Sequence, residues 1–511
     1  MTRAGSPFFR TVLSIAAGTL LAITPLSLGQ EQAPAAPQAA QLAFPAAQDV
    51  VFSIRIDPSV RSEAYSGRVY IVIAPPGPRE PKDAMNDWFG GPQVISFDVS
   101  GVKPGEQVRI PASALGFPKP IAEIPAGTYR VQAVARVDLD SPKPGQGVGD
   151  LYSETADIAF PASAPPEFTL TKAVESKPFK ESERVRLVEI ESPLLSKFYG
   201  RPVKTRAGVV LPVGWTDDAT KKYPTVYFIH GFGGDHTSAE PIARQSGTAA
   251  QGCIIVVPDP SCLLGHSVFA DSANNGPRGS SFIEELIPAV ESKFHGSGDG
   301  SNRYITGVSS GGWSSIWLQI TYPEQFAGTW SHVPDPVDFR DFQRIDLYAP
   351  GANMYKSPAG ERRGLARQND QVIIWYDDFI RQESVMGDGG QIHSFEAVFS
   401  PKGANGQPLP LFDRATGNVD PAVAKAWEAY DIRLILERNW STLGPKLAGK
   451  LHIFAGEKDT FFLEGATRLL KDSLAKLGSD AQVEIVPGMV HQPHRAGIEA
   501  MFKTIEERQK K

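Results

Sequence analysis

The second half of the chain contains short, nearly continuous apolar runs that predict buried strands. These runs are RVRLVEI (184–190), KTRAGVVLPVG (204–214), YPTVYFIHG (223–231), CIIVVPDP (253–260), RYITGV (303–308), KLHIFAG (450–456) and AQVEIVPG (481–488). Helical patterns lie between them, at 281–294, 314–326 and 467–478. Strands that are apolar on both faces and alternate with helices are typical of a parallel sheet covered by helices. The pattern therefore predicts a doubly wound, mostly parallel α/β sheet within residues 166–511.

Residues 46–165 have a different pattern. Short alternating runs rich in valine and isoleucine, from VVFSIRI to ETADIAFPA, are separated by Gly- and Pro-rich clusters such as PPGPREP. This spacing predicts an all-β, immunoglobulin-like sandwich that precedes the α/β domain. The stretch PASAPPEF (161–168) marks the expected boundary between the two.

The N-terminus has the composition of an export signal. Arg3 and Arg10 provide positive charge, residues 11–28 are mostly apolar, and small residues precede a cleavage point after Gly29. This predicts a signal peptide at 1–29, with an uncleaved membrane anchor as the alternative. Residues 30–45 are rich in Ala, Pro and Gln and predict a linker. We therefore expect a periplasmic or secreted protein with no stable membrane insertion after cleavage.

The overall composition is that of a globular protein, and it disfavours some partners. Apolar residues make up 41% of the 511 residues, charged residues 21%, and the net charge is −6. A chain with this charge and no basic run is not expected to bind nucleic acid. The two cysteines, Cys253 and Cys262, are nine residues apart with an extended strand between them, so we expect both to be unpaired.

The stretch YITGVSSGGWSS (304–315) contains four serines, and one of them fits a nucleophile motif. Only Ser309 has glycine two positions away on both sides, Gly307 and Gly311, as in G-x-S-x-G. Such a serine lies on a sharp turn from a strand to a helix, where its small neighbours let the two elements approach. We therefore predict Ser309 as a catalytic nucleophile.

A serine nucleophile also needs a base, an acid to orient the base, and donors for an oxyanion. Asp459 and His491 follow the strands KLHIFAG and AQVEIVPG, so the acid and the base both come after Ser309 in the chain. The turn HGFGG (230–234) follows the strand YPTVYFIHG, and its Phe232 N–H and that of Ser310 are the predicted oxyanion donors.

Two alternatives to these assignments stay open at the level of the sequence. Asp335, in HVPDP, is an alternative acid because its loop also follows a strand of the predicted sheet. His494 is an alternative base, although His491 lies nearer to the end of the last strand and His494 lies beside Arg495.

With these motifs the chain resembles the putative-esterase branch of the α/β-hydrolase superfamily, which includes esterase D, feruloyl esterases and enterochelin-esterase-like proteins. The resemblance rests on YPTVYFIHGFGG, FADSANNGPRGSSFIEELIPAVE, RYITGVSSGGWSS and GEKDTF with VPGMVHQPH. It implies a serine carboxylic-ester hydrolase with a Ser-His-Asp triad, an acyl-enzyme intermediate and no cofactor. Small-molecule or polysaccharide-linked esters, including acyl esters of carbohydrates, are the expected substrates. Because every catalytic candidate lies beyond residue 229, we expect the sandwich to be dispensable for small esters.

Residues 336–445 form a long insertion that departs from compact members of this branch. Trp375 and Trp427 in the insertion, together with His494, are candidate substrate-binding residues; the alternative is that the aromatic residues pack the insertion's own core. His491 and His494 do not predict a metal site, because Pro493 opposes the helical spacing that a zinc site of this kind needs. Acyl transfer, peptidase activity and a non-catalytic protein that binds carbohydrate or envelope are the alternative functions.

Overall fold

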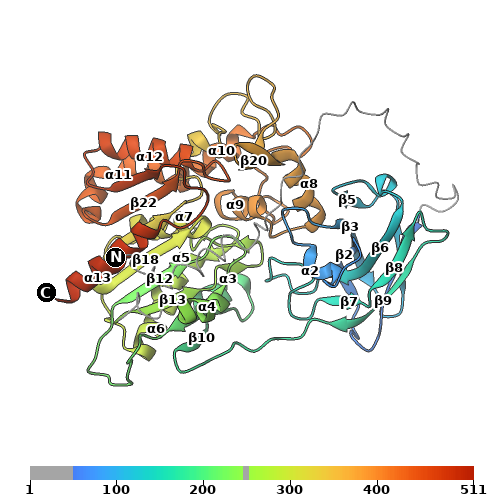
Figure 1. Ribbon diagram of the computed structural model, residues 1–511, viewed down its shortest axis with the longest axis horizontal. Coiled ribbons are helices and arrows are strands. Elements are labelled where there is room, and N and C mark those ends of the chain that lie inside the picture. Colours follow the sequence, from blue (N-terminus) through green and yellow to red (C-terminus); the bar gives the residue numbers. More distant parts are fainter. Residues whose placement is uncertain (1–49, 246–251, 511) are drawn as a thin grey trace, which may run out of the picture.

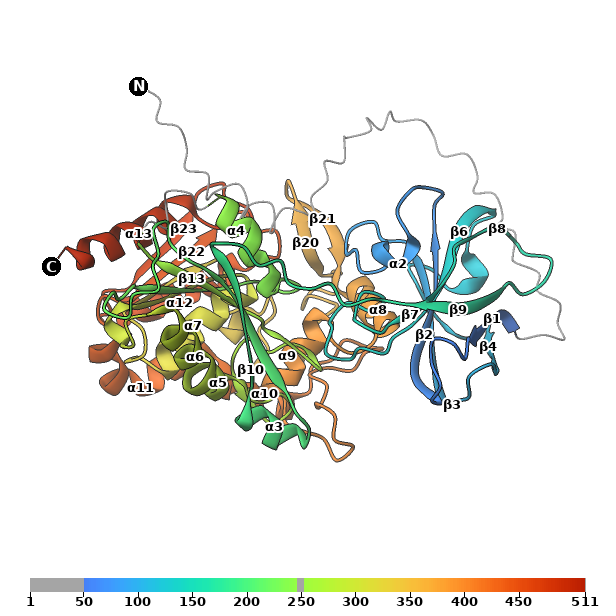
Figure 2. The same ribbon diagram turned by 90° about the horizontal axis from the view of Figure 1, so that it is seen from below.

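The computed structural model describes residues 50–245 and 252–510, so the predicted signal peptide and linker lie outside the described residues. Figures 1 and 2 show an all-β unit and a larger α/β unit, with helix α8 (Tyr376–Met386) lying between them. None of the described helices is long and apolar enough to cross a membrane. Cys253 and Cys262 are both buried and unpaired.

Residues 50–173, called the β domain below, form one hydrogen-bonded sheet. Its strands are β1 (Val50–Ile56), β2 (Tyr65–Ala74), β3 (Gln93–Val102), β4 (Gln107–Pro111), β5 (Leu115–Phe117), β6 (Gly127–Ala135), β7 (Leu151–Ser153), β8 (Ala156–Phe160) and β9 (Glu167–Ala173). The strand order is β4-β1-β9-β7-β6-β2-β3-β5, and β8 pairs with β6. Strand β9 pairs in parallel with β1, so the sheet continues past the predicted boundary at residue 165. The immunoglobulin-like topology stays a prediction.

The second unit, called the α/β domain below, contains an eight-stranded mixed sheet. Its strands, in spatial order, are β10 (Val185–Glu191), β11 (Lys204–Val210), β13 (Ile254–Pro258), β12 (Thr225–Ile229), β18 (Arg303–Val308), β19 (Gly328–His332), β22 (Leu451–Gly456) and β23 (Gln482–Val486). Strand β11 pairs antiparallel with both β10 and β13, and the pairs from β13 to β23 are parallel. The predicted α/β architecture is confirmed, and each predicted strand of this unit is present.

Helices pack on both faces of this sheet, and the doubly wound arrangement stays a prediction. The helices and short helical turns of the α/β domain outside the insertion are α3 (Pro193–Tyr199), η2 (His236–Ser238), α4 (Ala239–Gln245), α5 (Arg278–Ser281), the π-turn η3 (Phe282–Leu286), α6 (Ile287–Phe294), η4 (Gly300–Asn302), α7 (Ser310–Thr321), α12 (Glu464–Lys476) and α13 (Arg495–Gln509). Strand β12 shows the two faces: Tyr227 and Ile229 pack with α6, whereas Phe228 packs with α4 and α13.

The insertion between β19 and β22 has its own aromatic core. It contains η5 (Phe339–Asp341), β20 (Gly364–Gln368), β21 (Gln371–Trp375), α8, α9 (Gln391–Phe399), α10 (Pro421–Trp427), η6 (Glu428–Tyr430) and α11 (Ile432–Leu447). The rings of Phe339, Phe342, Phe399 and Trp427 lie within 6 Å of one another in several pairs. Figure 1 shows that α8 and α9 lie on the side of the insertion that faces the β domain.

Candidate active site

Ser309 lies on the sharp turn between β18 and α7. Its φ of 58° and ψ of −123° are in a region of backbone conformation that residues other than glycine rarely adopt. A Cβ atom at Gly307 would clash with the carbonyl oxygen of Gly311, and one at Gly311 would clash with that of Ile229. The two glycines of the motif are therefore required for the close approach of strand and helix, which holds Ser309 at the end of the sheet.

His491 and Asp459 form a hydrogen-bonded pair at the same edge of the sheet. His491 Nδ1 lies 2.8 Å from Asp459 Oδ2, and the Asp459 side chain is fully buried. Asp459 Oδ1 accepts a hydrogen bond of 2.8 Å from the backbone N–H of Phe461, which fixes the carboxylate. Burial alone would lower the pKa of His491. The negative charge of Asp459 and, to a smaller extent, that of Asp335 outweigh burial, so the pKa is raised.

The turn after β12 packs directly against Ser309. A Cβ atom at Gly231 would lie 3.0 Å from Cβ of Ser309, so a side chain there would press on the serine. Phe232 follows in this turn. Ser310 is the first residue of α7, where a backbone N–H has no acceptor within its own helix. The two predicted oxyanion donors thus belong to backbone segments that flank Ser309.

Asp335, the alternative acid, contacts the serines rather than the histidine. Its Oδ1 accepts a hydrogen bond of 3.3 Å from Ser309 Oγ, and its Oδ2 accepts one of 2.5 Å from Ser310 Oγ. Gln391, at the start of α9, donates to the same Oδ2 at 3.4 Å. Burial raises the pKa of Asp335 to about 6, although the bonds from the serines and the nearby His491 oppose this. Since His491 is bonded to Asp459, the geometry favours Asp459 as its partner.

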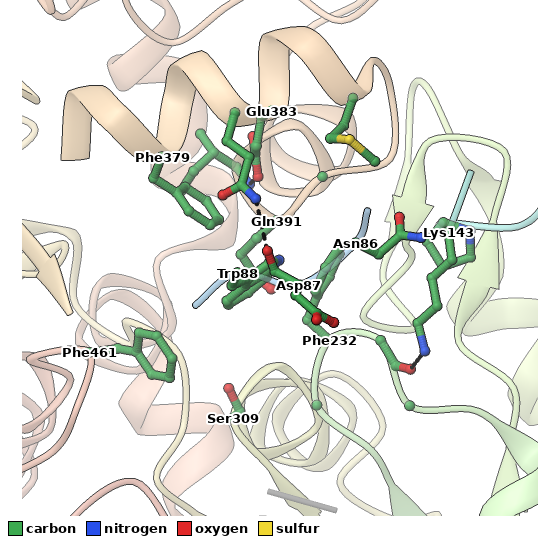
Figure 3. Close-up of a pocket in the computed structure, with 18 of the residues that line it drawn as sticks. Asn86, Asp87, Trp88, Lys143, Phe232, Ser309, Phe379, Glu383, Gln391 and Phe461 are labelled. Carbon is green, nitrogen blue, oxygen red and sulfur yellow. Dashed lines mark hydrogen bonds between the residues drawn. The ribbon is translucent and has the colours of Figure 1, made fainter. Parts of the chain in front are cut away.

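Ser309 and His491 line one cavity of about 480 Å³, with Asp335 beside them. Its wall contains the aromatic side chains of Trp88, Phe232, Phe379 and Phe461, which surround the space near Ser309 in Figure 3. Phe461 also contacts the His491 ring edge-on, with the ring centroids 4.9 Å apart. Aromatic side chains therefore form much of the cavity wall near Ser309.

Three predicted substrate-binding residues do not line this cavity. Trp427 is completely buried in the aromatic core of the insertion, and its indole N–H donates to Ser400 Oγ at 2.9 Å. Trp375 ends β21, where the Arg362 guanidinium lies 4.8 Å from its ring. His494 precedes α13 and its ring packs on Phe454, while its backbone N–H donates to His332 Nδ1 at 3.2 Å. For Trp427 the alternative interpretation, core packing, is correct.

The structure brings residues to the cavity that the sequence analysis did not identify. Trp88 and Lys143 come from loops of the β domain, and Phe379 and Gln391 come from the insertion. Among these, only the insertion was expected near the site, because loops that follow parallel strands gather at one edge of a sheet. No local pattern marks Trp88, which lies in the short segment MNDWFGG between β2 and β3.

The described residues include no group of three or more His, Cys, Asp or Glu side chains that could hold a metal ion. What these residues do provide is a hydroxyl on a strained turn, a histidine paired with a buried carboxylate, and backbone donors nearby. This set of groups defines the class of serine hydrolases that work through an α/β sheet.

Comparison with known proteins relates one segment of the chain to a family. Residues 200–377 match the family model described as "Putative esterase", which confirms the resemblance to the putative-esterase branch. The match of this segment indicates a serine ester hydrolase.

Solved structures similar to this chain include two esterases of low sequence identity. One is a ferulic acid esterase from Anaeromyces mucronatus, 14% identical, matching 64% of this chain and 92% of its own with a TM-score of 0.34. The other is an S-formylglutathione hydrolase from Agrobacterium tumefaciens, 15% identical, matching 63% and 95% with a TM-score of 0.37. The resemblance to the putative-esterase family rests on the sequence match of residues 200–377.

Proposed function

We propose that this protein hydrolyses carboxylic esters through Ser309, His491 and Asp459, with an acyl-enzyme intermediate. One observation carries the proposal: Ser309, on a strained turn, lines the same cavity as a histidine whose Nδ1 is 2.8 Å from a buried carboxylate. Acyl esters of carbohydrates are the proposed natural substrates.

In the proposed reaction, Ser309 Oγ attacks the carbonyl carbon of the ester and its proton passes to Nε2 of His491. Asp459 accepts the Nδ1–H bond, which selects the tautomer with a free Nε2 and stabilises the imidazolium that forms. The N–H groups of Phe232 and Ser310 donate to the oxyanion. His491 then gives its proton to the leaving alcohol. Water repeats the sequence on the acyl-enzyme, releases the acid and restores Ser309.

The test is the substitution Ser309→Ala in the full chain. We expect ester turnover to fall by several orders of magnitude, and labelling by a fluorophosphonate probe to disappear. The matched control is Ser315→Ala, because Ser315 belongs to the same helix and its hydroxyl bonds only the carbonyl of Gly312, at 2.8 Å. If Ser309→Ala keeps its turnover and its label, the serine has been misassigned.

Export is also part of the proposal, on the basis of residues 1–29, which have the composition of a signal peptide. Expression of the full chain in a bacterial host followed by N-terminal sequencing of the mature protein tests it. The expected mature protein begins after Gly29, and an intact N-terminus on a cytoplasmic protein would contradict export.

A further inference from the structure

Trp88 belongs to the β domain, yet its ring lies among aromatic side chains of the active-site cavity. It stacks on Phe232 with the centroids 5.5 Å apart and the planes inclined by 26°. Its ring also meets Phe379 edge-on at 5.0 Å and Phe461 at 6.1 Å. Phe232 belongs to the turn 230–234, called the oxyanion turn below because it contains a predicted oxyanion donor. Phe461 contacts His491. Only one residue therefore separates Trp88 from the proposed catalytic groups (Figure 3).

The β domain is held in this position by the end of helix α8. The last carbonyl groups of a helix have no partner within the helix. Arg68 donates to the carbonyl of Ser384 at 2.7 Å, and the hydroxyl of Tyr70 donates to that of Met386 at 2.6 Å. Both donors come from β2, and Tyr70 is completely buried. The sheet of the β domain therefore caps this helix.

Further contacts link the β domain to the same part of the insertion. Arg136, of the loop after β6, donates to the carbonyl of Asp388 at 2.7 Å. In the other direction, the Gln382 amide donates to the carbonyl of Asp87 at 3.0 Å, directly beside Trp88. Val385 completes a small apolar cluster that is otherwise made by the β domain. These contacts fix Trp88 relative to Phe379.

A second loop of the β domain contacts the oxyanion turn itself. Lys143 Nζ donates a hydrogen bond of 2.9 Å to the carbonyl oxygen of Gly233 (Figure 3). Gly233 has a φ of 80°, a conformation that most other residues avoid, and it directly follows Phe232. The charged Lys143 side chain, by bonding the Gly233 carbonyl, holds the backbone just after Phe232, whose N–H is a predicted oxyanion donor.

We propose that the β domain forms one wall of the substrate cavity, with Trp88 as a specificity-determining residue that contacts a planar apolar group of the ester. This proposal rests on the proposed function, because it assumes that the ester binds at Ser309. Lys143 acts as a positioning residue through the oxyanion turn, so the β domain contributes to the turnover of small esters as well, contrary to the expectation from the sequence. The wall is only partly buried at Trp88, so the indole has surface available for a ligand within the cavity.

The test of Trp88 compares kcat/KM for three esters: methyl acetate, methyl 2-naphthoate and 2-naphthyl acetate. We expect Trp88→Ala to lower kcat/KM by about 10- to 100-fold for at least one naphthyl ester, the range that a lost apolar contact gives. Methyl acetate should change by less than about 3-fold, because it is too small to reach the indole. Equal losses for all three esters, no change, or a gain with both naphthyl esters would overturn the proposal.

Two further variants keep this test decisive. Trp88→Phe retains a ring and should give an intermediate loss, and it replaces the alanine variant if that variant does not fold. Trp440→Ala is the matched control, since this half-buried tryptophan of α11 does not line the cavity. It should leave the ratio of the three kcat/KM values unchanged.

Lys143 needs a different measurement, because a positioning residue affects all substrates alike. Lys143→Met should lower kcat for methyl acetate and for a naphthyl ester by the same factor, with little change in KM, and Lys143→Arg should restore most of it. A rise in KM alone would show that Lys143 does not act through the turn. Failure of the proposed function has another signature: Ser309→Ala would remain active, whatever the Trp88 variants do.

Discussion

The buried carboxyl of Asp335 should make the protein less stable at neutral pH than its amide variant. Asp335 is 5% exposed and accepts hydrogen bonds from Ser309 and Ser310, but within the described residues it forms no ion pair of the kind that usually accompanies a buried charge. In Asp335→Asn, the amide oxygen can still accept from Ser310. The substitution therefore removes the charge while most of the packing remains.

The magnitude follows from the pKa. Burial raises the pKa of Asp335 from 3.8 to about 6. The folded state must therefore ionise a carboxyl that the unfolded chain ionises more easily, and this costs about 3 kcal/mol. Below the unfolded pKa the carboxyl is protonated in both states and costs nothing. As the pH rises through about 6 the cost becomes complete, so the advantage of the asparagine variant should grow over this interval.

Urea unfolding of both proteins between pH 4 and pH 8 measures this difference. The free energy of unfolding of Asp335→Asn, relative to the original protein, should rise by about 2.4 kcal/mol across the series, because a small part of the cost is already present at pH 4. Asp346→Asn, at an exposed position, is the control for general effects of removing a carboxylate. A relative free energy that stays constant with pH, or that falls as the pH rises, would refute the reasoning.

The remaining predictions concern the proposed base and the insertion. His491→Ala should lose as much turnover as Ser309→Ala, whereas His494→Ala should lose at most about 10- to 100-fold. An inactive His494→Ala variant would show that His494 is the base instead of His491. The Asp459 carboxylate raises the pKa of His491 above 6.5, so kcat/KM should increase as the pH rises through a pKa above this value. Asp335→Asn removes a second carboxylate that raises the pKa of His491, so it should shift this increase of kcat/KM to lower pH. Trp427→Ala should cost about 3–5 kcal/mol of stability in urea unfolding without changing the relative kcat/KM of different esters; a change of specificity at unchanged stability would contradict its place in the core.

The proposed catalytic residues could be identified from the sequence because each follows a strand in the chain. The strand patterns around Ser309, Asp459 and His491 are strong, and parallel strands place their carboxyl ends at one edge of a sheet. The steric role of Gly307 and Gly311 is likewise local: each is needed because one backbone passes close to another. The structure places these residues as the patterns predict, and their roles in catalysis stay predictions.

The other walls of the cavity could not be predicted, for a physical reason. The β domain docks by donating hydrogen bonds to the backbone carbonyls of Ser384, Met386 and Asp388, and every residue has such an acceptor. The residue pattern of α8 therefore does not predict that the β domain docks on this helix. The place of Trp427 could not be predicted either, because an aromatic residue can line a cavity or pack in a core. Its contacts with Phe399 and Phe339 show that it belongs to the core of the insertion.

The docking of the β domain on α8 has a consequence for the order of folding. The hydrogen bond between Gln382 and Asp87 joins residues 295 positions apart, and that between Arg68 and Ser384 joins residues 316 apart. Contacts of such long range form late, because a very long loop must close before they contribute. Trp88 is synthesised early but meets Phe379 only after the insertion has folded. The β domain can thus acquire its own core first, while substrate selection is completed by one of the last steps of folding.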